Sequence, residues 1–241
     1  MKTTEYIKNK IDRFSKGYVF TYKDFSNEVK NKEAIIKSLN RMAVAGKINK
    51  LSKGKYYKVE STVFGDLLPK QKQIVKDLLE KNGKTIGYIT GYSSYNELGL
   101  TTQISNTIQI GKNEIRTSFK RGIYKISFIK QKNIITKENI PLLKLLDAIR
   151  YIKRIPDATI DFSCSRLMSI LKKLSNKKIN LMMKLALNYP PSTRALLGAL
   201  LENINCTAST EILKKTLNPI TTYKLSVSKK TLPNIKNWNI Q

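Results

Sequence analysis

The first 60 residues alternate between helical and extended patterns of apolar positions. Ile7, Ile11 and Phe14 recur at the spacing of one helix face, which predicts a first helix. The segment Thr21-Tyr22-Lys23-Asp24 has the residues of a capping box and predicts a second helix that runs to about Val29. Both predictions rest on local signals alone.

A third helix is predicted over residues 32–45, with Asn31 as its N-cap and Gly46 as its stop. At 100° per residue, its larger apolar side chains fall within one arc. Lys37 and Arg41 centre the opposite arc, with Asn40 near them. One face therefore packs and the other faces outward; the packing residues are Ile35, Ile36, Leu39, Met42 and Ala43.

Two β-like runs follow, over residues 48–51 and 56–59. Gly54 lies between them and permits the positive φ of a tight hairpin. Three helices followed by a basic hairpin is the order of a winged helix-turn-helix, so residues 1–62 are predicted to form such a domain. The hairpin carries three lysines, Lys50, Lys53 and Lys55.

This arrangement suits double-stranded DNA, because the major groove admits one α-helix. The outward residues of the third helix would contact base edges, and the hairpin lysines would contact phosphates. The alternative is an ordinary solvated helix face in a domain that mediates protein contacts. The candidate DNA-binding residues are Lys37, Asn40, Arg41, Lys50, Lys53 and Lys55.

The remainder, residues 63–241, is predicted to form a second domain, so the fold class is α+β. Residues 63–136 are expected to contain strands, and residues 137–217 show apolar periodicity typical of a helical bundle. The tail, residues 218–241, shows no clear pattern, and Trp238 is expected to dock it. Finer expectations are a link over 64–68, a helix from Pro69 to Gly83, and a turn at 111–114.

The net charge of the chain indicates what class of partner it binds. The chain of 241 residues has 45 Lys+Arg and 17 Asp+Glu, which gives a formal net charge of +28. A surface this positive attracts polyanions, of which nucleic acid is the commonest in the cytoplasm. A composition rich in Lys, Asn and Ile offers a second explanation for the charge, so the charge by itself decides little.

Several catalytic sites are excluded by residue type. Histidine is absent, which removes Ser-His-Asp and Cys-His sites and imidazole ligands of zinc. Gly83-Lys84-Thr85 resembles the end of a phosphate-binding loop, but Leu78 stands where that loop needs glycine. Asp157 and Asp161 are spaced four apart, unlike the Asp-x-Asp pair of a nucleotidyl transferase. We therefore expect no enzymatic activity, no metal and no cofactor.

The expected location is the cytoplasm. No apolar run reaches the roughly 20 residues of a membrane span, and the amino terminus has no run typical of a secretory signal. Cys164 and Cys206 are too few for a disulfide framework or a zinc site and are expected to be small buried side chains.

Four further segments are distinctive: Gly87-Tyr88-Ile89-Thr90-Gly91, residues 96–103, Arg121-Gly122-Ile123-Tyr124 and residues 189–198. Together with the amino-terminal winged unit, they resemble the AbiEi family, the antitoxins of type IV toxin–antitoxin and abortive-infection loci. The resemblance implies an autorepressor that binds inverted repeats in its own promoter and counters a nucleotidyltransferase toxin encoded beside it. Whether the toxin is contacted directly stays open.

Arg194 lies in the last of these segments, after Pro190-Pro191, and is a candidate to meet a carboxylate or phosphate of a partner. An internal ion pair with Glu202 or Asp161 is the alternative.

Two further functions stay open. One is an RNA- or single-strand-binding module without an antitoxin role, in which Tyr88, Tyr92 and Tyr95 form a stacking surface. The other is a histidine-free nuclease or nucleotidyl transferase, which metal-dependent turnover would reveal.

Overall fold

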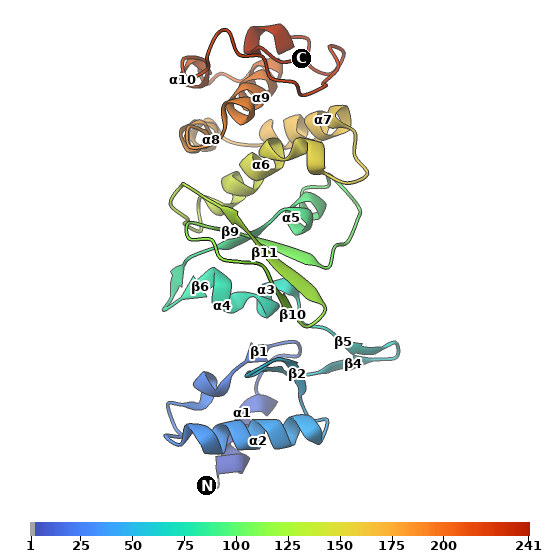
Figure 1. Cartoon of the computed structure of the whole chain (residues 1–241), viewed down its shortest axis with the longest axis vertical. Helices are drawn as coiled ribbons and strands as arrows, with labels where there is room; N and C mark the ends of the chain where they lie inside the picture. The colour runs from blue at the N-terminus through green and yellow to red at the C-terminus, as the bar shows by residue number, and fades with distance from the viewer. Residues whose placement is uncertain (1–2) are drawn as a thin grey trace. The chain divides into compact units, whose positions relative to one another are not determined.

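The computed structural model describes residues 3–241, and the chain divides into two compact units (Figure 1). The first unit extends to Asp77 and includes Phe119–Lys125; the second comprises Leu78–Ser118 and Ile126–Gln241. The fold is α+β, with helices and several small sheets. Sequence analysis placed a boundary at residue 62, whereas the compact units divide the chain at Asp77. Contacts within the first unit explain the difference, since the Val19 amide donates to Gln73 Oε1 at 3.4 Å.

The first unit begins with an antiparallel three-stranded sheet of order β1-β3-β2 and two helices. Phe20 pairs with Tyr56, and Asn49 pairs with Tyr57 across the sheet. Ile7, Phe25 and Leu39 are buried beneath it with other apolar residues. In chain order the elements are α1 (Thr3–Asp12), β1 (Val19–Phe20), the 3₁₀ helix η1 (Tyr22–Phe25), α2 (Lys32–Val44), β2 (Asn49–Ser52) and β3 (Lys55–Tyr57).

The predicted caps are present, but the second predicted helix is wrong in length. Thr21 Oγ1 accepts from the Lys23 amide, and Asp24 accepts from the Thr21 amide at 2.8 Å, as a capping box requires. The helix that follows is a single 3₁₀ turn that ends at Phe25 rather than near Val29. Phe25 is the buried anchor of this turn, and the next residues are mostly exposed, so packing does not extend the helix.

Residues 60–79 differ from the predicted link and single helix. They form a two-stranded hairpin, β4 (Glu60–Thr62) and β5 (Gly65–Leu67), and then two short helices, α3 (Gln71–Ile74) and α4 (Lys76–Leu79). Arg121 Nη1 donates to the Ile74 carbonyl at 2.6 Å. A continuous helix would use that carbonyl for the amide of residue 78, so this contact accounts for the break.

The second unit contains the hairpin of β6 (Glu80–Lys81) and β7 (Lys84–Thr85) and a four-stranded sheet of order β10-β11-β9-β8. Gly83 therefore does not end a helix; with Asn82 it forms the positive-φ turn between β6 and β7. The predicted turn at 111–114 is wrong at its start, because Gly111 and Lys112 lie in β9. The sheet elements are β8 (Tyr88–Thr90), β9 (Thr107–Lys112), β10 (Phe119–Arg121) and β11 (Tyr124–Lys130), with helix α5 (Tyr92–Glu97) between β8 and β9.

The helical pattern predicted for residues 137–217 is present in the second unit (Figure 1). Helix α6 contacts β8, α8 and α9, and so joins the sheet to the other helices. Trp238, in the 3₁₀ helix η3 (Ile235–Trp238), is 1% exposed and docks the tail as expected. The helices are α6 (Ile140–Arg150), η2 (Ile152–Arg154), α7 (Ile160–Leu171), α8 (Asn176–Ala186), α9 (Pro191–Asn203) and α10 (Glu211–Lys214).

Within residues 3–241, no helix combines the length and the hydrophobicity that a membrane span requires. Of the two cysteines, Cys164 is buried, as expected, and Cys206 is partly exposed.

Candidate nucleic-acid interfaces

Helix α2 presents a polar face because its apolar face is held in the first unit's core. The Asn31 side chain accepts from the Ala34 amide at 3.0 Å and fixes the start of the helix. Ile35 and Leu39 are fully buried, which turns the opposite side outward. Lys37 and Arg41 are exposed there, as the sequence predicts.

Asn40 lies on the same exposed side, and its carboxamide has a fixed position. The Tyr56 hydroxyl donates to Asn40 Oδ1 at 2.7 Å, which links helix α2 to strand β3. Burial raises the pKa of the Tyr56 hydroxyl, so it stays a proton donor at neutral pH. The side chain of Asn40 is therefore held at the helix surface by a neutral partner.

Two exposed residues of this helix face were missed by the sequence analysis. Val44 is 91% exposed in the last turn of α2, and Glu33 is exposed in its first turn. The sequence signal for Val44 is an apolar residue outside the packing arc, which predicts an exposed position. Such a methyl-bearing side chain can contact the thymine methyl group, and a carboxylate can accept from cytosine N4.

The β2–β3 hairpin places two of its three lysines outward. Lys50 and Lys53 are exposed, and Gly54 at φ 72° makes the turn beside Lys53. Lys55 differs, because its side chain is 18% exposed and its ammonium lies 3.2 Å from Asp77. We therefore leave Lys55 out of the surface formed by Lys37, Asn40, Arg41, Lys50 and Lys53, which we call the basic face.

Asp77 holds two cations of the first unit. Arg121 Nη1 lies 2.7 Å from one carboxylate oxygen, and Lys55 Nζ lies 3.2 Å from the other. Partial burial raises the pKa of this carboxyl, but the hydrogen bonds and charges of Arg121 and Lys55 outweigh it and hold the pKa below its ordinary value. Lys55 is thus part of the protein's own ion-pair cluster.

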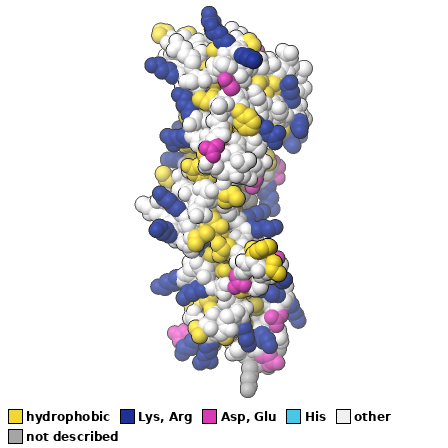
Figure 2. Space-filling model, turned by 90° about the vertical axis from the view of Figure 1, so that its right-hand side faces the viewer, with side chains coloured by type: hydrophobic (Ala, Val, Ile, Leu, Met, Phe, Trp, Pro, Cys, Tyr) yellow, Lys and Arg dark blue, Asp and Glu magenta, His cyan; other side chains and the backbone are white. Residues whose placement is uncertain are grey.

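The excess of positive charge is visible on the surface. Lysine and arginine side chains are spread along the face in Figure 2, and acidic side chains are few among them. Among residues 3–241, side-chain ion pairs join Lys55 and Arg121 to Asp77 and Lys144 to Glu97, and the 45 Lys+Arg of the chain far outnumber its 17 Asp+Glu.

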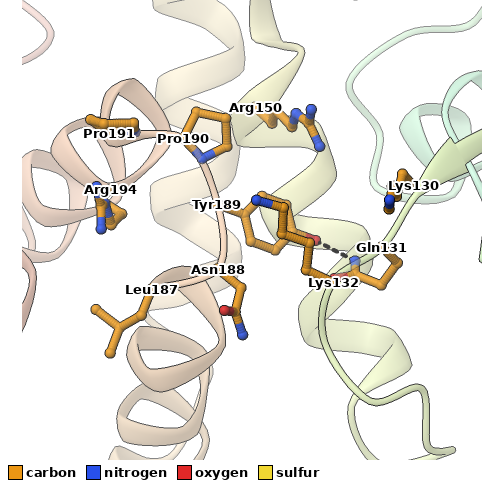
Figure 3. A pocket seen from close by; sticks show the side chains of 10 residues that line it. All are labelled: Lys130, Gln131, Lys132, Arg150, Leu187, Asn188, Tyr189, Pro190, Pro191 and Arg194. Atoms are coloured by element: carbon orange, nitrogen blue, oxygen red, sulfur yellow. Dashed lines mark hydrogen bonds between the residues drawn. The ribbon is translucent and has the colours of Figure 1, made fainter. Parts of the chain in front are cut away.

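Arg194 lines a pocket of about 400 Å³ in the second unit (Figure 3). Pro190 and Pro191 start helix α9 at the rim, and Arg194 lies in the first turn of that helix. Three more cations line the same pocket, from β11 and the residues after it and from the end of α6: Lys130, Lys132 and Arg150. We call this the cationic pocket.

The alternative considered for Arg194, an internal ion pair with Glu202 or Asp161, is not formed within the described residues. Glu202 accepts hydrogen bonds from Asn234, Asn237 and Trp238 instead, and Asp161 accepts from the Ser228 amide. The Nε atom of Arg194 is buried and has no hydrogen-bond partner in residues 3–241. Sequence alone cannot supply this result, since the partners of Glu202 come from the tail.

A buried polar network lies beneath the cationic pocket. Gln131 Nε2 donates to the hydroxyls of Tyr88 and Tyr189, each at 2.8 Å. Both hydroxyls then donate to the Asp147 carboxylate, at 2.7 and 2.9 Å, and Thr90 adds a third donor at 2.8 Å. Figure 3 shows the Gln131–Tyr189 contact at the pocket.

Asp147 is 1% exposed, so its charge is costly. Burial raises the pKa of the Asp147 carboxyl, and the donors Tyr88, Thr90 and Tyr189 oppose that rise. Burial, with the nearby Asp147 carboxylate, also raises the pKa of Tyr88 and Tyr189, so both remain donors. Asp147 was not predicted from the sequence, because its one local signal is an acid inside the apolar pattern of a helix.

A second pocket, of about 320 Å³, adjoins the cationic pocket, since Lys130 lines both. Tyr92, Tyr95 and Tyr151 line it, together with Phe128, Arg154 and Gln109. We call it the aromatic pocket. Tyr88 is absent from its lining and is buried against Asp147, so Tyr88, Tyr92 and Tyr95 do not share the open stacking surface that the sequence predicted.

Comparison with known proteins adds a family and a fold. The model of a family of unknown function, DUF6088, matches residues 6–181. No curated protein matches. Among solved structures, the crystal structure of the RV2827C protein from Mycobacterium tuberculosis is similar, with a TM-score of 0.58 and 10% sequence identity over 88% of this chain and 81% of that one. At this identity the likeness concerns the fold alone.

Proposed function

Since the chain belongs to the DUF6088 family, whose function is unknown, we propose a function from its own residues and from the AbiEi resemblance: a DNA-binding antitoxin and transcriptional autorepressor of a type IV toxin–antitoxin operon. One observation carries the DNA-binding half. Helix α2 turns Lys37 and Arg41 outward, and the hairpin after it carries Lys50 and Lys53 outward.

We infer that residues 3–57 act as a winged helix-turn-helix. The order of helices and strands, α1-β1-η1-α2-β2-β3, and the sheet order β1-β3-β2 support this inference. In such a domain, α2 enters the major groove and the β2–β3 hairpin is the wing. The wing tip is Lys53-Gly54, and Gly54 has the positive φ of a tight turn.

The basic face has residues for both kinds of DNA contact. Arg41 and Lys37 would donate to guanine O6 and N7, and the Asn40 carboxamide suits adenine. Lys50 and Lys53 would bind phosphates and fix the register without choosing a sequence. The expected target is a pair of inverted repeats in the chain's own promoter, as the AbiEi resemblance implies.

The basic face predicts that DNA affinity falls with salt. Two phosphate-reaching cations, Lys50 and Lys53, give a slope of about −1.8 in log affinity against log salt, or a loss of roughly 10-fold between 50 and 200 mM. We expect Arg41→Ala to lower the ratio of operator to random-duplex affinity by about 10-fold. Lys53→Ala should weaken both duplexes equally and reduce the slope by about 1. Fluorescence anisotropy titration with labelled duplexes measures all three quantities.

Lys178→Ala is the matched control, because Lys178 is exposed on α8 in the other unit. Equal affinity of the unmodified protein for operator and random duplex would contradict sequence-specific binding. Tighter binding of a single strand than of the duplex would favour the alternative, an RNA- or single-strand-binding module without an antitoxin role.

The antitoxin half is supported by the AbiEi resemblance and is assigned to the second unit. We expect Arg194→Ala to fold, with an unchanged melting temperature, and to lose protection of cells that express the neighbouring nucleotidyltransferase toxin. We expect this loss of protection because the Arg194 guanidinium lies at the rim of the cationic pocket, where it can bind a carboxylate or phosphate of the partner system. Co-expression and growth measurements test this, with Lys178→Ala as the control. A folded Arg194→Ala variant that still protects the cells would rule out this role for Arg194.

A further inference from the structure

We propose that the second unit binds a phosphorylated nucleotide, with its phosphates in the cationic pocket and its base in the aromatic pocket. The ligand is a free nucleoside triphosphate or the terminal nucleotide of an RNA strand. All the lining residues belong to the second unit, so this site is independent of the basic face and of the DNA-binding proposal.

The cationic pocket carries a concentrated positive charge. Lys130, Lys132, Arg150 and Arg194 surround a volume of about 400 Å³, and no carboxylate lines it. None of the four forms an ion pair with a carboxylate anywhere in residues 3–241. Cations gathered without a counter-ion raise the local affinity for anions, and four of them suit a ligand with several negative charges.

The Asp147 carboxylate forms no ion pair with any of these four cations within residues 3–241, although the positive charge of Arg150 helps to lower its pKa. It lies beneath the pocket, is almost fully buried, and receives hydrogen bonds from three hydroxyl groups. Most of the positive charge in the cationic pocket is therefore left for a ligand.

The side chain of Arg194 also points to an anionic ligand. Its Nε atom is buried and has no acceptor within the described chain. Buried donors are nearly always satisfied, so an unsatisfied one calls for an explanation, and an acceptor supplied by a ligand in the pocket that Arg194 lines is a physical one. Guanidinium groups bind phosphate oxygens through two parallel hydrogen bonds, so a phosphate is a suitable acceptor for Arg194.

The aromatic pocket lies on the other side of Lys130. Rings of Tyr92, Tyr95 and Tyr151 line it, and the first two meet edge to face with centroids 6.2 Å apart. The guanidinium groups of Arg150 and Arg154 lie over the Tyr151 ring at 4.9 and 5.2 Å. Because Arg150 lines the cationic pocket and Arg154 the aromatic one, Tyr151 connects the two pockets.

Gln109 gives the aromatic pocket a polar group that can contact a base edge. Its side chain occupies the space beside Gly91, where a β-carbon would overlap the Gln109 carboxamide. Gly91 also has a positive φ of 64°, so glycine is needed there for two reasons. Because Gly91 has no side chain, the Gln109 carboxamide can lie against the backbone there, and the aromatic pocket stays open.

The cationic pocket and the aromatic pocket together favour a nucleotide over other anions and over apolar ligands. An inorganic polyphosphate would use only the cationic pocket, and an apolar ligand would use only the aromatic one. Volumes of about 400 and 320 Å³ are in the range of small-molecule sites. A nucleotide joins a planar aromatic base to phosphates and so fits both pockets together.

Isothermal titration calorimetry on the full chain tests the proposal with four probes: ATP, CTP, inorganic triphosphate and a 12-nucleotide single-stranded RNA. We expect ATP or CTP to bind with a dissociation constant of about 1 mM or tighter, and inorganic triphosphate to bind about 10-fold more weakly or worse. RNA that binds more tightly than ATP and CTP and is displaced by them identifies the terminal nucleotide of a strand as the ligand. RNA that binds no more tightly than ATP or CTP, or that they do not displace, identifies the free nucleotide.

Two variants separate the two pockets. Arg150→Gln is expected to weaken every probe by about 10-fold, because a charged hydrogen bond to phosphate is lost. Tyr92→Ala is expected to weaken the nucleotides and the RNA but leave inorganic triphosphate unchanged. Lys178→Gln on α8 is the charge-matched control, and Arg41→Ala removes a cation of the basic face. Melting curves establish that each variant is folded.

The proposal is overturned if ATP, CTP and RNA all fail to bind at millimolar concentration. It is also overturned if inorganic triphosphate binds as tightly as the nucleotides, or if Lys178→Gln weakens binding as much as Arg150→Gln does.

Discussion

Replacement of Asp147 by alanine is expected to lower the free energy of unfolding of the second unit by about 3 kcal/mol or more, because each buried hydroxyl left without its acceptor costs about 1–3 kcal/mol. Three hydroxyls lose that acceptor, those of Tyr88, Thr90 and Tyr189. Urea denaturation followed by the fluorescence of Trp238, the chain's one tryptophan, reports on the second unit alone. Glu114→Ala, at an exposed acid of the same unit, should change the value by less than about 0.5 kcal/mol.

The Asp147 carboxyl also predicts how the free energy of unfolding depends on pH. Burial raises the pKa of Asp147 in the folded state, so its contribution to stability is largest below its unfolded pKa and is lost as pH rises through the folded-state pKa. The neutral variant Asp147→Asn lacks this loss. The stability of the unmodified chain relative to Asp147→Asn should therefore fall as pH rises from about 4. A stability difference that does not change with pH would show that Asp147 has an ordinary pKa.

Trp238→Ala is expected to cost about 3–5 kcal/mol, the usual range for a large buried aromatic side chain. The indole ring packs against Gly198 of α9, where a β-carbon would overlap the ring. Its Nε1 group also donates to Glu202, which Asn234 and Asn237 hold in place. Loss of the indole ring leaves a cavity between α9 and the tail. Gly198 has no side chain that could fill this cavity.

Circular dichroism at 222 nm during thermal unfolding measures this loss without the tryptophan signal. The released tail should also be cut faster by trypsin, at Lys224, Lys229 and Lys230, under native conditions. Lys236→Ala, at an exposed residue of the same 3₁₀ helix, is the control. Unchanged melting and unchanged trypsin cleavage in Trp238→Ala would mean that the tail is held by its other contacts.

Local signals explain which parts of the first unit were predictable. The Asn31 cap, the Thr21 capping box and the packed face of residues 32–45 depend on neighbours within one or two turns, and the structure contains all three. The break between α3 and α4 depends instead on Arg121, which is distant in the sequence from the Ile74 carbonyl that it contacts. A periodic pattern cannot register such a contact.

The pockets of the second unit show the same limit. Arg194 was identified from its segment, but its surroundings come from β11, α6 and the residues before α9. Lys55 appeared equivalent to Lys50 and Lys53 in the sequence, and only the fold pairs it with Asp77. Tyr88 appeared equivalent to Tyr92, and only the fold buries it beside Asp147. Residue type and spacing predicted the candidates, and tertiary contacts decided their roles.

The buried network around Asp147 has a consequence for the kinetics of folding. Its hydrogen bonds join residues 42 to 59 positions apart, through Tyr88, Thr90, Gln131 and Tyr189. Closing such long loops is slow, and a carboxylate excluded from water before its donors arrive is destabilising. The rate-limiting barrier of the second unit should therefore include the joining of β8, α6 and the segment before α9, so that refolding shows one late cooperative phase rather than independent helix formation.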